Sequence, residues 1–259
     1  MNIEFIGHQG LHNPSQGICD EYELSAVNDF EALLEVRRRL ALDHPGSMLL
    51  VSLDDRGQAR YTSGHARLNL ELDTPTEAEL AALPPGCFEA GQYVGYTTCK
   101  DEFALCLRNL RERVAGTTFT DACGHGLTLD DAAVQEWIGF QQAPLTLLDQ
   151  PLAALVVPVQ DSADALVAFP NGYFTCDLSP AMNHAVVRHL QVQGYQLFGV
   201  GASYLGLLRA EPADAHVAAA VAEAFAALYN VEASNQAVFV ATVMAAVGGQ
   251  RHLWMRYTE

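Results

Sequence analysis

The chain has 259 residues, of which 50% are hydrophobic and 17% are charged, so it carries ample material for a core and is not expected to be disordered. Thirty-one acidic residues against 14 basic ones give a formal net charge of −17. A field of that sign repels nucleic-acid phosphates and anionic lipid surfaces. Composition therefore argues against direct nucleic-acid binding and against membrane docking.

The sequence predicts a protein that is not exported. No uninterrupted apolar stretch reaches the roughly 18 residues of a spanning helix, and the opening residues, MNIEFIGHQG, predict no signal peptide. The six cysteines are scattered along the chain, which favours reduced thiols over a disulfide framework. We expect a soluble, cytoplasmic protein.

The first half predicts an irregular mixture of strands and helices. Apolar spacing indicates helices at 27–42, 101–114 and 128–140, and a short helix after Thr74. The segment Asp54–Gly57 has the acidic, glycine-ended composition of a hairpin turn. Strands are expected at 2–6, 48–53, 58–62, 66–72 and 92–97.

The second half has a clearer pattern. A buried strand at 153–159 precedes a helix that opens at Ser179-Pro180. Strands at 196–200 and 204–209, helices over about 217–228 and 235–247, and a closing strand at 253–257 follow. The predicted order is β-α-β-β-α-α-β, which is typical of one sheet with helices mostly on one face.

The stretch 141–151 contains two prolines and no strong period, so a domain boundary is expected there. The fold class predicted is α+β, with two domains that each form a mainly antiparallel sheet with helices on one face. The domains are residues 1–145, which are the more acidic part, and residues 146–259.

The second half resembles an uncharacterised bacterial C-terminal domain family that ends in an aromatic strand. The segments that carry the resemblance are Val156–Val159, Asn183–Leu190, Gly194–Val200, Ala213–Val247 and Leu253–Tyr257. The resemblance implies a fold and no established activity. The chain as a whole is similar to bacterial immunity proteins, which implies a role in neutralising a secreted toxin.

Residue spacing predicts no metal site and no cofactor. Zinc sites use Cys and His pairs whose spacing lets them converge on one tetrahedron, and no such set occurs. Cys123-Gly124-His125 comes nearest, and it is interpreted as a loop with an incidental thiol.

Cys99 is the best candidate nucleophile, because it precedes the helix at Asp101 and lies beside Lys100. Asp101 and Glu102 oppose this by raising the pKa of the thiol, and no histidine is placed nearby by sequence. A small thiol-dependent or other hydrolase that uses Cys99 or Cys123 is the alternative function. The leading interpretation assigns no catalytic residue.

The leading hypothesis is based on pairs of adjacent acidic residues. Helix starts and hairpin tips favour acids on their own, and a negative surface aids solubility, but neither accounts for so large a surplus. The hypothesis is a non-catalytic inhibitor of a basic toxin, such as a nuclease effector of type VI or related secretion. A scaffold module with an apolar patch is a third interpretation. The expected partner-binding residues are Asp54, Asp55, Asp101, Glu102, Asp130 and Asp131.

Overall fold

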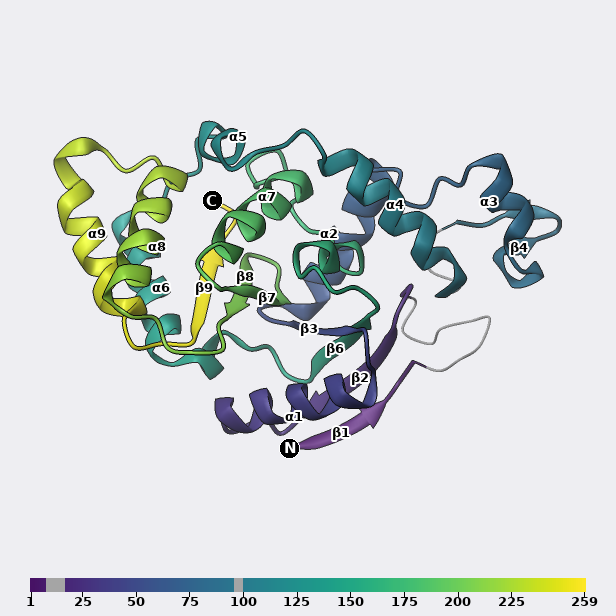
Figure 1. Cartoon of the computed structure of the whole chain (residues 1–259), viewed down its shortest axis with the longest axis horizontal. Coiled ribbons are helices and arrows are strands. Elements are labelled where there is room, and N and C mark those ends of the chain that lie inside the picture. The colour runs from purple at the N-terminus through teal and green to yellow at the C-terminus, as the bar shows by residue number, and fades with distance from the viewer. Residues whose placement is uncertain (8–16, 96–99) are drawn as a thin grey trace.

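Strands from both halves of the chain form one mixed sheet in the computed structural model, which describes residues 1–7, 17–95 and 100–259. Their spatial order is β1-β2-β6-β3-β7-β8-β9 (Figure 1). Neighbouring strands are antiparallel except β3 and β7, which run parallel. The strands are β1 (Asn2–Phe5), β2 (Asp20–Ser25), β3 (Met48–Ser52), β6 (Leu152–Val157), β7 (Gln196–Val200), β8 (Tyr204–Leu208) and β9 (His252–Arg256), with β4 (Phe88–Glu89) and β5 (Gln92–Tyr93) forming a separate pair.

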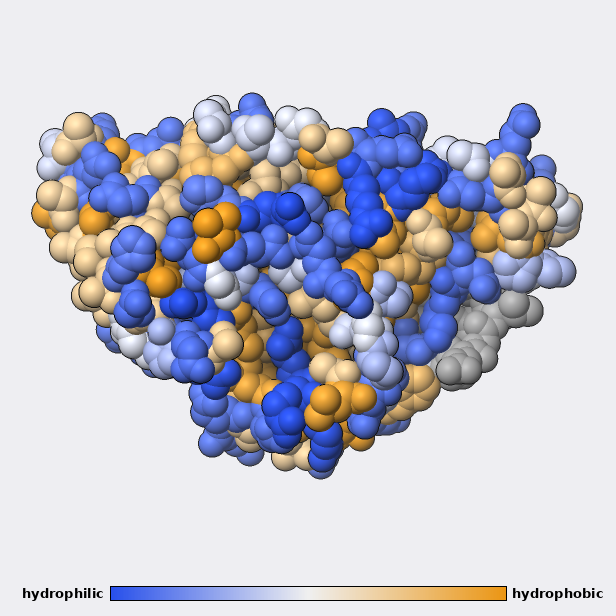
Figure 2. Space-filling view, viewed as in Figure 1, coloured by the Kyte–Doolittle hydropathy of each residue, from blue (hydrophilic) through white to orange (hydrophobic). Residues whose placement is uncertain are grey.

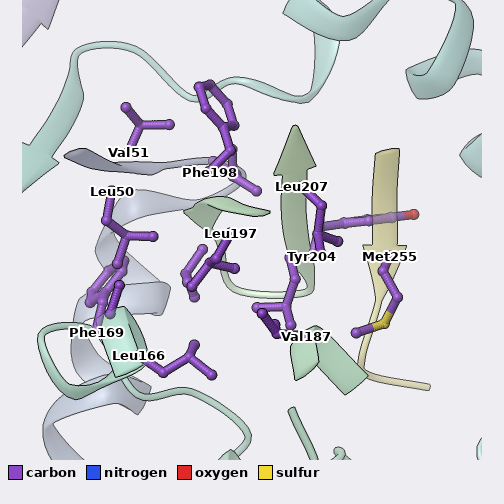
Figure 3. Packing of buried hydrophobic residues seen from close by; sticks show 14 of the residues in the cluster. Leu50, Val51, Leu166, Phe169, Val187, Leu197, Phe198, Tyr204, Leu207 and Met255 are labelled. Carbon is purple, nitrogen blue, oxygen red and sulfur yellow. The ribbon is translucent and has the colours of Figure 1, made fainter. Parts of the chain in front are cut away.

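Helices cover both faces of this sheet. Along β7, Leu197 lies on the side of Val187 in α7, and Phe198 points to the opposite side (Figure 3). There Phe198 meets Phe30 of α1, with 6.0 Å between ring centroids. The interior strand β6 is buried at every position, as a strand enclosed on both faces must be. The helices are α1 (Phe30–Asp43), α2 (Arg56–Asn69), α3 (Glu77–Ala82), α4 (Phe103–Val114), α5 (Phe119–Gly124), α6 (Asp131–Gln142), α7 (Pro180–Gln191), α8 (Ala215–Leu228) and α9 (Ala233–Val247).

The α+β class is confirmed, but the expectation of a separate sheet in each half, with helices on one face, is wrong. Strand β3 comes from the first half, yet it pairs with β6 on one side and β7 on the other. The strands on the two sides of the expected boundary at 145/146 therefore belong to the same sheet. Long-range pairing of this kind leaves no mark in local sequence pattern.

The element order of the second half is confirmed as β6-α7-β7-β8-α8-α9-β9. The strands expected at 58–62 and 66–72 are wrong, because residues 58–62 and 66–69 lie in α2 and residues 70–72 form the turn after it. The supposed hairpin turn at Asp54–Gly57 is the start of that helix, where the Asp55 side chain accepts a hydrogen bond from Gln58 N. Within the described residues, no helix combines the length and the apolarity needed to cross a membrane.

Candidate functional site

Asp54 is folded beneath the turn between β7 and β8. Its Oδ2 accepts a hydrogen bond from Ser203 N at 2.8 Å, and its backbone carbonyl accepts one from Ala202 N at 3.0 Å. A Cβ at Gly201 would lie 1.7 Å from Asp54 Oδ1, so only glycine permits this approach. Burial raises the pKa of Asp54 to about 6. Asp54 secures a turn instead of presenting its carboxylate to a partner.

The other acids expected at an interface have different surroundings. Asp55 and Asp130 cap helices, and Asp130 Oδ1 accepts from Ala133 N at 2.7 Å. Asp131 follows in the first turn of α6 and is exposed, as is Asp101. Glu102 is fully buried. Four of the six therefore reach the surface, and Asp130 and Asp131 lie together at one helix start.

Of the two cysteines in the alternative hypothesis, Cys123 lies within the described residues. Cys99 lies outside the described residues. Cys123 is half-buried in α5, and burial raises the pKa of its thiol, which disfavours the reactive thiolate. His125 Nε2 lies 3.3 Å from the carbonyl oxygen of Cys176. In the part of the chain that the structure describes, no three His, Cys, Asp or Glu side chains gather closely enough to hold a metal ion.

The fold brings two segments without basic residues together. Residues 114–187 and 210–250 contain no lysine or arginine. These two stretches supply α5, α6, α8 and α9, and α9 packs on α8 and α6 while α5 packs on α8. In Figure 1, α6, α8 and α9 lie together at the left, beyond β9, and α5 lies at the top of the view, near α7. We call these four helices the anionic end; its exposed acids are Asp121, Asp130, Asp131, Glu136, Asp214, Glu223 and Glu232.

Most ion pairs within the described residues involve acids outside the anionic end. Next to it, Arg256 of β9 lies 3.3 Å from Glu136. Elsewhere the basic residues are largely matched with acids of the chain itself, as in Arg108 with Glu79 at 2.8 Å. Other such pairs join Arg38 to Glu35, Arg56 to Glu23, Lys100 to Asp20, Arg111 to Asp164 and Arg251 to Glu31. The four helices of the anionic end thus contain no lysine or arginine, and among the described residues Glu136 alone of the seven acids is in an ion pair.

The outer helix of this end, α9, contains no charged residue. Its side chains Ala237, Val238, Ala241 and Ala245 are exposed at helical spacing, and Val238 keeps 71% of its surface. Figure 2 shows hydrophobic colours over α8 and α9, interrupted by hydrophilic patches. An apolar centre with a polar rim is the usual anatomy of a protein–protein interface.

No family model, curated protein or solved structure matches the chain.

The base-free stretches can be found from the sequence alone. Absence of lysine and arginine over 114–187 is a stronger signal than Asp54-Asp55, because a single pair of acids also suits a helix cap. What the sequence does not show is that 114–187 and 210–250 meet in space.

Proposed function

We propose that the chain is a non-catalytic, acidic binding protein that captures a basic protein on its anionic end and blocks it. The observation that supports this is the base-free composition of 114–187 and 210–250 together with the packing of their helices at one end of the molecule. The partner class proposed is a secreted bacterial toxin with nuclease activity, and the role is that of an immunity protein.

The mechanism is electrostatic and steric. A nuclease cleft is lined by cationic side chains that hold phosphates, and the carboxylates of the anionic end offer the same charge. Opposite charge accelerates encounter. The uncharged face of α9, centred on Val238, then supplies apolar contacts that slow dissociation. A partner held in this way cannot reach its substrate.

The test uses two variants with equal net charge. The end variant carries Asp130→Asn, Asp131→Asn, Glu223→Gln and Glu232→Gln; Asn is used because it retains the helix cap at 130. The control variant neutralises four exposed acids elsewhere. Its substitutions are Glu4→Gln, Asp43→Asn, Glu77→Gln and Glu89→Gln, so both variants change −17 to −13.

Each protein serves as bait in an extract of the native cells. We expect a basic protein that the wild type and the control variant retain and the end variant loses, and whose nuclease activity falls on addition of equimolar wild type. A partner retained equally by all three baits, or one without toxic activity, would contradict the proposal.

A further inference from the structure

A cavity of about 330 Å³ opens beside α2, away from the anionic end. Helix α2 lines it with Arg60, Ser63, Gly64, His65 and Arg67. Strand β2 contributes Glu21, strand β6 contributes Leu155, and the segment after it contributes Phe169. In Figure 1, α2 lies well to the right of α8 and α9, so the cavity is separate from the proposed partner surface.

Arg67 is the unusual member of this lining. Its side chain is on a residue only 5% exposed, and one terminal nitrogen donates to the carbonyl oxygen of Ala168 at 3.2 Å. Its Nε is buried without a hydrogen-bond partner among the described residues, and Arg67 forms no ion pair with any of them. The stretches 8–16 and 96–99 contain no Asp or Glu. Within residues 1–7, 17–95 and 100–259, no acid lies within ion-pair distance of this guanidinium.

The charged side chains that line the cavity are Glu21, Arg60 and Arg67. An arginine side chain stays protonated, and a buried charge without a partner is costly. Glu21 is the acid in the lining, and it forms an ion pair with Arg60. These two charges cancel, so Arg67 leaves one positive charge for a ligand to neutralise. A monoanion satisfies this balance, whereas a dianion would exceed it and face Glu21.

The remaining walls suit an apolar body. Leu155 and Phe169 are buried residues that line the cavity. His65 lies between two aromatic rings, with centroids 4.5 Å from Tyr61 and 4.9 Å from Tyr173. A volume near 300 Å³ is at the small end of ligand pockets. The site therefore fits a compact molecule with one charged group and an apolar remainder.

We propose that this cavity binds a small monocarboxylate with an aromatic or short aliphatic body. The carboxylate pairs with Arg67, and the body contacts Leu155 and Phe169. This site is independent of the partner surface described above, and failure of either proposal leaves the other standing.

Isothermal titration calorimetry with sodium benzoate, in buffer of matched ionic strength, tests the proposal. The wild type is expected to bind benzoate saturably at one site. Benzyl alcohol, which lacks the charge, and inorganic phosphate, which lacks the apolar body, are expected to bind at least roughly tenfold more weakly, because a charge-assisted hydrogen bond is worth that much. Absence of benzoate binding, or phosphate binding of equal strength, overturns it.

Two variants locate the site. Arg67→Met is expected to weaken benzoate binding at least about tenfold. Gly64→Leu fills the cavity without removing a native contact, because a Cβ at Gly64 meets nothing within 4 Å. It is expected to abolish binding, while Gly64→Ala, the matched control, retains it. Should Arg67→Met fail to fold, Gly64→Leu still decides the matter; unchanged binding in Gly64→Leu overturns the proposal.

Discussion

At the scale of single residues, three adjacent acid pairs that look alike in sequence have different positions. Asp54 lies under a turn, Glu102 is buried, and Asp130 caps a helix. The caps could be predicted, because Asp before a helical pattern is a common start signal. The position of Asp54 could not, since Gly201 and Ser203, which hold it, lie about 150 residues away.

Asp54→Asn tests the surroundings of this carboxyl. Its folded pKa of about 6 exceeds the ordinary 3.8 of an unfolded Asp, so the folded state favours the protonated form. The protonated Asp54 carboxyl therefore contributes to the free energy of unfolding at low pH, and this contribution is lost as the pH rises from about 4 through 6. A shift of about two pH units corresponds to about 3 kcal/mol. The free energy of unfolding of Asp54→Asn, relative to wild type, should rise by about that amount between pH 4 and pH 7.

Urea denaturation at the two pH values measures this difference. Asp43→Asn, at an exposed position, serves as the control and should show little change. A difference between Asp54→Asn and wild type that stays constant from pH 4 to pH 7 would show that the carboxyl has an ordinary pKa in the folded protein.

At the scale of elements, α2 explains why part of the first half was misassigned. The residues that α2 buries are small or polar, namely Ala59, Thr62, Ser63, Ala66 and Arg67. No apolar stripe therefore marks the helix, and the alternation of Leu68, Leu70 and Leu72 suggested a strand instead. Helices α4 and α7 bury apolar residues at helical spacing; the predicted bounds of α4 lie close to those observed, and the predicted start of α7 at Ser179-Pro180 is confirmed.

The side chain of Gln141 in α6 protects part of the outer edge of the sheet. Gln141 Nε2 donates to His252 O at 2.8 Å, and Gln141 Oε1 accepts from Trp254 N at 3.2 Å. This amide thus pairs with β9 as the backbone of a neighbouring strand would. Both β9 groups are buried, so loss of their partner is costly.

Gln141→Leu should therefore lower the free energy of unfolding by about 2–4 kcal/mol, since two buried backbone groups lose a partner. Chemical denaturation measures it. Gln142→Leu, at the exposed neighbouring position, should change stability by less than about 0.5 kcal/mol. Equal effects of the two substitutions would show that Gln141 contributes no edge pairing.

The start of α6 allows a second comparison. Asp130→Ala should lower the free energy of unfolding by about 1 kcal/mol, because Ala133 N loses its acceptor. Asp130→Asn should largely preserve stability, since Asn also caps. Thermal denaturation of the two variants checks this, and a loss with Asn as large as that with Ala would argue against a capping role.

At the scale of the whole molecule, the chain distributes its charge by region. Segments 114–187 and 210–250 are separated in sequence, and the fold brings their helices together. The surplus of acids was predictable from composition. The grouping of seven exposed acids on the anionic end was not, because it depends on the packing of α9 against α6 and α8. The expectation of an acidic binding surface now rests on Asp130, Asp131 and their neighbours on the anionic end.

The most direct test of this surface is the association rate with the captured partner, measured by stopped flow over a range of NaCl concentrations. The wild type and the control variant should associate fast at low salt and slow steeply as salt rises. The end variant, at the same net charge, should associate at least about tenfold more slowly at low salt, with a shallower salt dependence. Identical rates and salt slopes for the end and control variants would show that the anionic end does not recognise the partner.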